Sequence, residues 1–170
     1  MRKLIIGSVV ALLLALVGVG IVFVVGMRAK SPAVLNTVRR TSRAMKPLVM
    51  RSAGTPGAPA SVIRHVGRVT GCPFETPVGA VAIDDGFVIA LPYGSNTDWL
   101  KNVLASGSAV IVDEGSTYEV DQPEVVPLAV EALPFSPADQ RAHRLFGVEQ
   151  CLRVRRITSD ETSRQVAGPA

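Results

Sequence analysis

The most constraining feature of the sequence is an apolar run near its start, Leu4 to Met27, which contains no charged side chain and almost nothing polar except Ser8. As a helix rising about 1.5 Å per residue, the run is long enough to cross the hydrocarbon core of a bilayer, about 30 Å thick. A cleaved signal peptide has a shorter apolar core of about 7–15 residues and a cleavage site of small residues, and neither fits this run. The run therefore predicts one N-terminal transmembrane helix.

Basic residues on the two sides of this run predict its orientation. Arg2 and Lys3 precede the run, and a larger group follows it, consisting of Arg28, Lys30, Arg39, Arg40 and Arg43. Cytoplasmic flanks of membrane helices carry the excess of Lys and Arg. We therefore expect a protein that crosses the cell membrane once and has its main domain on the cytoplasmic side.

The segment Pro32 to Met50 mixes apolar and basic residues in the manner of an amphipathic helix. Two interpretations remain open: a helix on the membrane surface, with its arginines near anionic headgroups, or a helix packed onto the following domain. The Gly/Pro/Ala-rich stretch Arg51 to Ala60 marks a linker. The predicted organisation is an anchor with basic flanks (1–30), an amphipathic stalk and linker (31–60), a folded domain (61–157) and a disordered tail (158–170).

Charge and cysteine usage argue against several classes of function. The formal net charge of +4 is concentrated just after the apolar run rather than over the folded domain, so no nucleic-acid-binding surface is expected. Cys72 and Cys151 lie far apart, without a CxxC motif or clustered histidines, so no metal site is expected. The two cysteines could pair if the fold brings them together, but two free thiols are the simpler interpretation.

The folded domain consists of short apolar, β-rich runs separated by turn residues. Strands are predicted at 60–68, 76–83, 87–91, 109–112, 117–120, 124–133 and 149–157, with hairpin turns at 84–86, where Gly86 allows a positive φ, and at 113–115. Helices are predicted from Asn96 to Ser106, ended by Gly107, and from Ser136 to about Phe146. Six or seven strands with two short helices predict a mainly β (α+β) domain, a small barrel or sandwich.

The stretch from Arg64 to Asn102 carries the chemical interest, because two glycine-bearing loops, 67–71 and 92–96, precede Trp99. Backbone amides of such loops can hold an anionic group, and an indole can cover a flat ring. Two ordinary turns and a core tryptophan are the alternative interpretation. The sequence contains no nucleophile elbow, zinc-protease or phosphate-loop motif, and its two histidines, His65 and His143, lie far apart. A hydrolase with its own acid–base pair is therefore not expected.

The residues of this stretch resemble a known family. The sequence GRVTGCPFETPV (67–78), an Asp-Gly hairpin, a glycine loop and WLKNVLA (99–105) are similar to the deazaflavin-dependent nitroreductases. These are small split β-barrel proteins, mostly actinobacterial, that are distantly related to the pyridoxamine-phosphate-oxidase-like flavoproteins. The resemblance covers residues 62–123. It implies a single split β-barrel that binds coenzyme F-420, an 8-hydroxy-5-deazaflavin, with FMN the less favoured cofactor.

Carried over residue by residue, the resemblance implies a cofactor site. Its residues would be Arg68, Thr70 and Gly71 toward the phosphate-bearing tail, Pro77 and Val78 along the groove, Tyr93, Gly94 and Ser95 as a second cradle, and Trp99 and Asn102 at the border of the cofactor. Tyr93 is also the one candidate for a proton donor to the reduced substrate. Because the cofactor carries the hydride, the protein supplies position and electrostatics, which agrees with the missing acid–base pair.

Two places depart from the family pattern. Val69 stands where cofactor-binding members usually carry Lys or Arg, and Pro92-Tyr93-Gly94-Ser95 stands where a Ser-Lys-Gly-Gly-like loop is usual. Each lost cation would weaken the binding of a polyanionic tail by about 1.5–3 kcal/mol. That energy corresponds to roughly tenfold or more in affinity.

The leading expectation is a membrane-anchored oxidoreductase that transfers a hydride from reduced coenzyme F-420 to a lipophilic acceptor such as a quinone or a nitro compound. The alternative is a non-enzymatic module of the same fold that binds a lipid or a fatty acid. In both cases membrane lipids would surround the N-terminal helix, and the barrel could form a homodimer.

Overall fold

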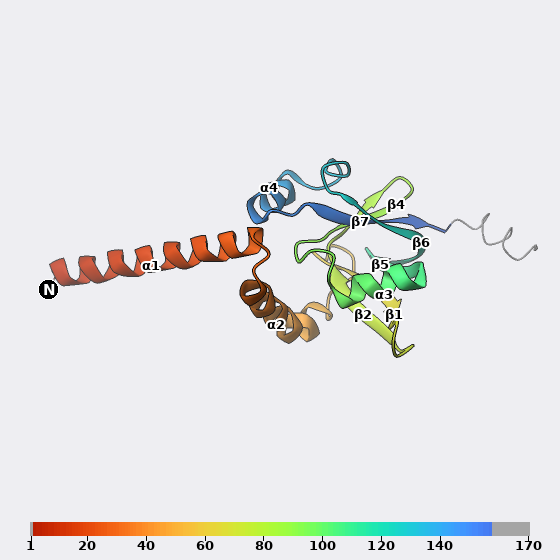
Figure 1. Ribbon diagram of the computed structural model, residues 1–170, viewed down its shortest axis with the longest axis horizontal. Helices are drawn as coiled ribbons and strands as arrows, with labels where there is room; N and C mark the ends of the chain where they lie inside the picture. The colour runs from red at the N-terminus through yellow and green to blue at the C-terminus, as the bar shows by residue number, and fades with distance from the viewer. Residues whose placement is uncertain (1, 158–170) are drawn as a thin grey trace, which may run out of the picture.

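The computed structural model describes the backbone of residues 2–157 and the side chains from residue 12 onward (Figure 1). The predicted tail, 158–170, lies outside the described residues. The elements are α1 (Arg2–Arg28), α2 (Pro32–Val49), β1 (Ser61–Val66), β2 (Pro73–Val78), β3 (Ala80–Ile83), β4 (Gly86–Ala90), α3 (Asp98–Ser106), β5 (Ser108–Asp113), β6 (Ser116–Pro127), α4 (Pro137–Phe146) and β7 (Gln150–Arg156).

The strands form one antiparallel sheet in the order β2-β1-β5-β6-β7-β4-β3. Its two edge strands, β2 and β3, are separated in sequence only by Gly79. The chain therefore passes directly from one edge to the other, which requires the sheet to curl until its edges meet (Figure 1). The result is an α+β fold with a split-barrel-like sheet. The β-rich pattern predicted a small barrel or sandwich, and the family resemblance implied the split barrel.

Apolar side chains pack on both faces of the sheet. Inside the curl, Ile63, Phe87, Ile111 and Leu152 from the strands surround Leu100 of α3, and all five are fully or almost fully removed from water. On the outer face, a smaller cluster lies at the β4–β7 pair and the segment before α4, and consists of Val88, Leu128, Phe135, Val148 and Cys151. Strand β4 contributes to both clusters, which explains its continuous apolar sequence.

Two strand predictions were wrong. The predicted strand at 76–83 is two strands, since the chain changes edges at Gly79 between β2 and β3. The predicted separate strand at 124–133 does not exist, because β6 itself continues to Pro127 and the chain then leaves the sheet. A shift in the β6–β7 pairing between Asp121 and Glu124, with Gln122 at φ 49°, bends β6 at the point where the sequence suggested a break.

The glycine of the first hairpin has a different role from the one predicted. Gly86 does not have a positive φ, and it pairs with Ile83 at the end of the hairpin. A Cβ atom at this position would collide with the carbonyl oxygen of Val154 and lie 2.9 Å from the Cα of Arg155. The second hairpin follows the prediction, since Glu114 and Gly115 have φ angles of 49° and 77° between β5 and β6.

Three of the four ends of α3 and α4 carry the capping expected of their residues. The Ser136 hydroxyl accepts a hydrogen bond from the backbone N–H of Asp139 at the start of α4. Gly107 and Gly147 end α3 and α4 with φ angles of 72° and 62°. Thr97 precedes α3, but its hydroxyl makes no cap hydrogen bond.

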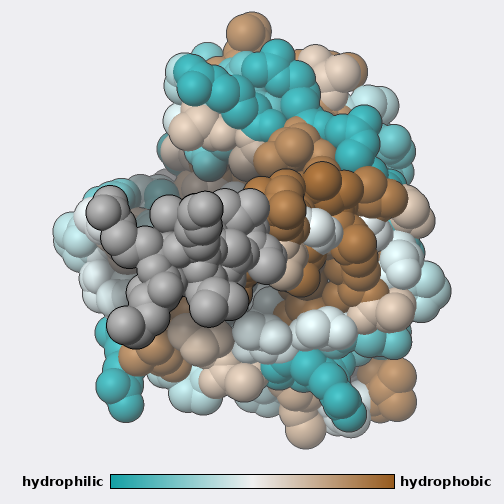
Figure 2. All heavy atoms as spheres, turned by 90° about the vertical axis from the view of Figure 1, so that its left-hand side faces the viewer, coloured by the Kyte–Doolittle hydropathy of each residue, from teal (hydrophilic) through white to brown (hydrophobic). Residues whose placement is uncertain are grey.

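Helix α1 projects from the domain, and its apolar side chains are exposed from Leu12 to Val25 (Figures 1 and 2). Figure 2, seen from the side on which α1 projects, shows a group of hydrophobic residues bordered by hydrophilic ones. Among residues 12–157, where α1 contributes only Leu12–Arg28, no single helix meets the length and apolarity needed to cross a membrane. Leu12–Arg28 and Pro32–Val49, bent by 100° relative to each other, meet that requirement only as a pair. The helical form predicted for the apolar run is confirmed.

The elbow between α1 and α2 is held against the domain. Arg28 donates hydrogen bonds from Nη1 to the carbonyl oxygens of Arg144 and Leu145 at the end of α4, the first at 2.7 Å. Lys30 Nζ donates to the Gly147 carbonyl oxygen at 3.1 Å and to that of Pro92 at 3.4 Å. Three of these bonds place cations on carbonyl groups at the C-terminal end of α4, which is electrostatically favourable. Helix α2 then contacts β2, so the structure favours packing onto the domain over the membrane-surface interpretation.

Candidate functional site

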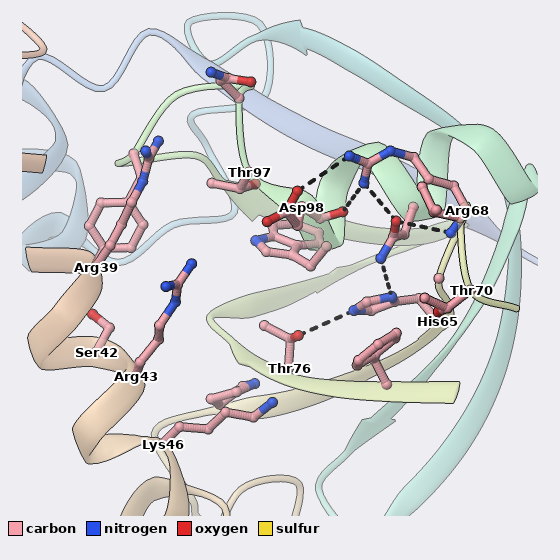
Figure 3. A pocket seen from close by; sticks show the side chains of 18 residues that line it. Arg39, Ser42, Arg43, Lys46, His65, Arg68, Thr70, Thr76, Thr97 and Asp98 are labelled. Atoms are coloured by element: carbon pink, nitrogen blue, oxygen red, sulfur yellow. Dashed lines mark hydrogen bonds and ion pairs between the residues drawn. The ribbon is translucent and has the colours of Figure 1, made fainter. Parts of the chain in front are cut away.

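A cavity of about 620 Å³ lies between α2, the turn that follows β1, strand β2 and the start of α3 (Figure 3). Helix α2 forms one wall, and the loop before α3 and Trp99 form another. The residues that line it are Arg39, Ser42, Arg43, Lys46, His65, Gly67, Arg68, Val69, Thr70, Phe74, Thr76, Pro77, Tyr93, Asn96, Thr97, Asp98, Trp99 and Asn102. Its volume is typical of small-molecule sites, about 300–1,000 Å³.

The wall formed by α2 is strongly cationic. Arg39, Arg43 and Lys46 follow one another at positions i, i+4 and i+7, so they share one face of the helix and line the cavity (Figure 3). Among residues 12–157, none of the three has a carboxylate within salt-bridge distance. The only acidic residue in the lining is Asp98, which already pairs with Arg68 at 3.3 Å. The cavity therefore has an excess of positive charge that favours an anionic ligand.

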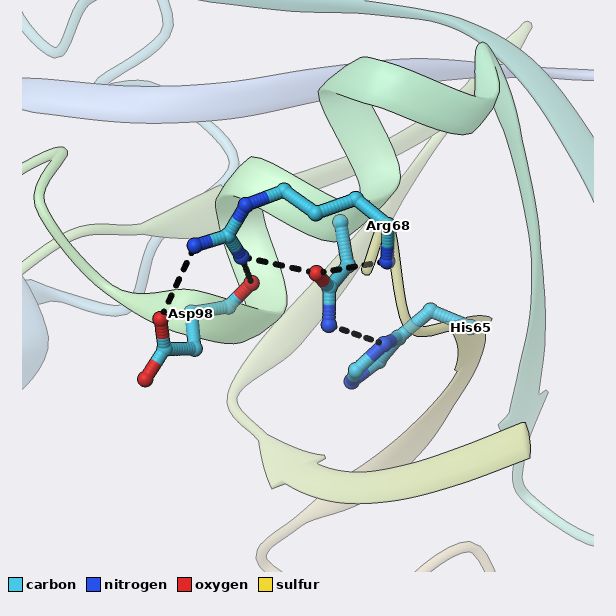
Figure 4. A network of polar contacts seen from close by, with 4 residues as sticks. His65, Arg68 and Asp98 are labelled. Atoms are coloured by element: carbon cyan, nitrogen blue, oxygen red, sulfur yellow. Dashed lines mark hydrogen bonds and ion pairs between the residues drawn. The ribbon is translucent and has the colours of Figure 1, made fainter. Parts of the chain in front are cut away.

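Arg68 holds a network of polar side chains on the opposite wall (Figure 4). Its backbone N–H and its Nη1 both donate to Oδ1 of Asn102, at 3.2 and 2.8 Å. Nη1 and Nη2 also reach the backbone oxygen and the carboxylate of Asp98 at the start of α3. The guanidinium therefore ties the β1–β2 turn to α3, and its predicted contact with the cofactor tail stays a prediction.

His65 lies on the floor of the cavity, and only 6% of its surface is exposed. Nδ1 lies 3.3 Å from Nδ2 of Asn102, Nε2 lies 3.2 Å from the Thr76 hydroxyl, and the ring stacks on Phe74. Burial lowers the pKa of His65 from its ordinary value of 6.5, and the charge of Lys46 lowers this pKa further. His65 is therefore neutral at physiological pH.

The lowered pKa of His65 predicts a pH-dependent stability. Below about pH 6.5 the unfolded chain protonates His65 while the folded chain keeps it neutral, so the free energy of unfolding should fall as the pH falls from 7 to 5. His143, whose pKa burial also lowers, should contribute in the same window. His65→Gln should flatten this dependence, measured by urea unfolding of the full chain in nanodiscs across that range. A variant with the wild-type slope would contradict the prediction.

A second cavity, of about 210 Å³, adjoins the first. The two share Pro77, Tyr93, Thr97 and Trp99 in their linings. The rest of the second lining is mainly apolar and consists of Val78, Gly79, Ile89, Ala90, Leu91, Pro92 and Gly94. A cationic cavity therefore leads past the single tryptophan of the chain to an apolar one.

The residues predicted for the site lie mostly around these two cavities. Six of them, Arg68, Thr70, Pro77, Tyr93, Trp99 and Asn102, line the larger cavity, and Val78 and Gly94 line only the smaller one. Gly71 and Ser95 line neither. Their roles toward a cofactor are untested and stay predictions.

Sequence reasoning missed the three cations of α2, as well as His65 and Thr76. The spacing of Arg39, Arg43 and Lys46 on one helical face was a usable signal, but the membrane-surface interpretation explained the same residues. No signal in the sequence pointed to His65, because its partner Asn102 lies 37 residues away.

The cysteines lie apart from the site lining and from each other. Cys72 is exposed, Cys151 is buried, and both are free thiols. Burial, together with the charge of Glu131, raises the pKa of Cys151 to about 11, so its thiol stays protonated at physiological pH.

The sequence matches no family model, and no curated protein matches it. In structure, the chain is similar to F-420-dependent reductases and to split-barrel proteins of the pyridoxine-phosphate-oxidase family. A solved protein described as an F-420 reductase is 13% identical, with a TM-score of 0.42, and the match covers 64% of this chain and 92% of that one.

Two further similar structures differ in their descriptions. The heme storage protein HutZ from Vibrio cholerae is 11% identical, with a TM-score of 0.43, and the match covers 59% of this chain and 83% of that one. A chain described as a domain-swapped dimer is 17% identical, with a TM-score of 0.41, and the match covers 70% and 96% of the two chains. Likeness this distant supports no argument about the activity, cofactor or assembly of this chain.

Proposed function

We propose that this protein is a membrane-anchored oxidoreductase that binds reduced coenzyme F-420 in the larger cavity and reduces a lipophilic acceptor such as a quinone or a nitro compound. One observation carries the proposal. Arg39, Arg43 and Lys46 line the same cavity as the β1–β2 turn and Trp99, so a single ligand can meet three cations and an aromatic ring. A polyanionic tail joined to a flat ring has this combination of properties.

The lining fits such a cofactor in charge and in aromatic surface. The α2 cations supply the positive charge that is missing at Val69 and in the Pro92–Ser95 loop, where the family pattern would have it. Trp99 and Tyr93 supply aromatic surface at the passage to the apolar cavity. When bound, the cofactor supplies hydride-transfer chemistry.

The protein would then position the reactants. The three cations of α2 bind the anionic tail, and Trp99 borders the ring and limits its orientation. The phenolic hydroxyl of Tyr93 is the proposed proton donor to the reduced acceptor, because Tyr93 lines both cavities. The neutral His65 helps to position its neighbours in the site and adds no charge to it.

The anchor is a second part of the proposal, supported by the exposed apolar side chains along α1. We propose that α1 crosses the cell membrane with the barrel on the cytoplasmic side, where a membrane-dissolved acceptor is within reach. Proteases added outside intact cells should leave the barrel uncut, and external digestion of the barrel would overturn the orientation. Release of the full chain from membranes by alkaline carbonate would overturn the anchor.

A titration tests the cofactor. Full-length protein in nanodiscs should show saturable binding of oxidised coenzyme F-420. Binding is measured by the quenching of the fluorescence of Trp99, the only tryptophan of the chain. The protein should then accelerate the oxidation of reduced F-420 by menadione. No saturable binding at high micromolar cofactor would overturn the proposal. Tight binding of a fluorescent fatty acid in its place would support the alternative, a lipid-binding module.

A further inference from the structure

A chain of hydrogen bonds crosses the floor of the larger cavity and connects Arg68 to Thr76 (Figures 3 and 4). Arg68 contacts Oδ1 of Asn102, Nδ2 of Asn102 contacts Nδ1 of His65, and Nε2 of His65 contacts Oγ1 of Thr76. The three side-chain links measure 2.8, 3.3 and 3.2 Å. The four residues come from β1, the turn after it, β2 and α3, so tertiary packing alone brings them together.

The chemistry of the groups fixes the direction of this chain. The backbone N–H and the Nη1 of Arg68 are both donors, and both point at the same atom of Asn102. That atom is therefore the amide oxygen. The amide nitrogen then donates to Nδ1 of His65, which must be the unprotonated nitrogen of a neutral ring. Nε2 therefore carries the proton and donates to the Thr76 hydroxyl oxygen.

Thr76, the last member of this chain of hydrogen bonds, has an O–H group that can donate to a ligand. Because the Thr76 oxygen accepts from His65, its own O–H is a donor, and Thr76 lines the cavity. Among residues 12–157, that hydroxyl donates no hydrogen bond to a protein acceptor. Each link polarises the next, which strengthens the terminal O–H as a donor.

We propose that the Thr76 hydroxyl is a dedicated hydrogen-bond donor to the bound ligand and selects for a carbonyl or ionised oxygen at that position. This proposal rests on the proposed function, because it assigns a contact within the same site. Arg68, Asn102 and His65 are positioning residues that hold the hydroxyl in the donating orientation. A ligand that presents a donor at this position can use only the remaining lone pair of the Thr76 oxygen and leaves the Thr76 O–H without an acceptor on the ligand, so it binds less tightly.

The surroundings of His65 preserve this arrangement. Protonation at Nδ1 would place its N–H against the Asn102 amide donors, and Asn102 cannot turn over without facing Arg68 with those donors instead. Lys46 lines the same cavity from α2 and also disfavours a charged ring. The Phe74 ring, stacked at 5.8 Å, limits tilting of the imidazole.

The direction of the chain is tested by nitrogen NMR of the full-length protein in nanodiscs with ¹⁵N-labelled histidine. The protein has two histidines, and His143→Gln leaves the signals of His65 alone. The expected spectrum shows Nε2 protonated and Nδ1 unprotonated. Asn102→Asp, which offers an acceptor in place of the donor, should move the proton to Nδ1. A wild-type ring protonated at Nδ1 would overturn the proposal.

The contact with the ligand is tested with oxidised coenzyme F-420 as the probe. Thr76→Val keeps the shape but removes the hydroxyl, and should weaken binding about tenfold, whereas Thr76→Ser should stay within about threefold of wild type. Valine binding as tightly as threonine would overturn the assignment of Thr76 and leave the proposed function standing. Absence of binding by the wild type would overturn the proposed function, and with it the ligand contact of Thr76.

Discussion

Replacing Arg39, Arg43 and Lys46 together by glutamine should lower the affinity for oxidised coenzyme F-420 by about a thousandfold. Each hydrogen-bonded charge is worth about 1.5–3 kcal/mol. Each single replacement should therefore cost roughly tenfold or more, and a thousandfold is the loss for three independent tenfold effects. Because the three cations share one ligand, double-variant measurements should show coupling between them. Cofactor fluorescence, titrated against the full chain in nanodiscs, measures the loss.

The matched control lies on the same helix. Arg40→Gln removes an equal charge from an exposed position that does not line the cavity, so it should leave the affinity nearly unchanged. Added salt should weaken the wild-type complex more than that of the triple variant, because fewer charges remain to be screened. If the triple variant binds the cofactor as well as wild type does, the α2 cations do not hold the tail and the central observation of the proposed function fails.

Gly86→Ala should destabilise the domain by about 3 kcal/mol or more, the upper range for overpacking a rigid site. The new methyl group would meet the carbonyl oxygen of Val154 and the Cα of Arg155, which are backbone atoms that cannot rotate away. Strands β4 and β7 would have to separate at their first paired residues. For a domain of this size the melting temperature should fall by more than about 10 °C.

Gly79→Ala is the control for this substitution. A methyl group at Gly79 would have open space within 4 Å, apart from its chain neighbours, and Gly79 has no positive φ, so its replacement should be tolerated. Circular dichroism of both variants in nanodiscs gives the comparison. Equal melting temperatures for Gly86→Ala and wild type would mean that β4 and β7 are farther apart than the structure has them.

Local features of the fold were predictable from the sequence. The Ser136 cap, the glycines that end α3 and α4, and the Glu114-Gly115 turn follow from backbone preferences within a few residues. The split-barrel resemblance likewise depends on an ordered motif within one stretch of about forty residues. The failures concern β6 and the 76–83 run, where a bulge and a change of sheet edge depend on distant partners.

In the candidate site, too, local sequence features were predictable and contacts between distant residues were not. The sequence alone indicated a long apolar helix and a β-rich domain, and it predicted Arg68, Trp99 and Asn102 as site residues, all of which line the larger cavity. Only the tertiary structure decided that the basic face of α2 closes the cavity, because the elbow bonds of Arg28 and Lys30 set the position of that helix. The same holds for the direction of the Arg68–Asn102–His65–Thr76 chain. Hydrogen bonds between residues far apart in the sequence leave no periodic pattern in it, so no local pattern predicts them.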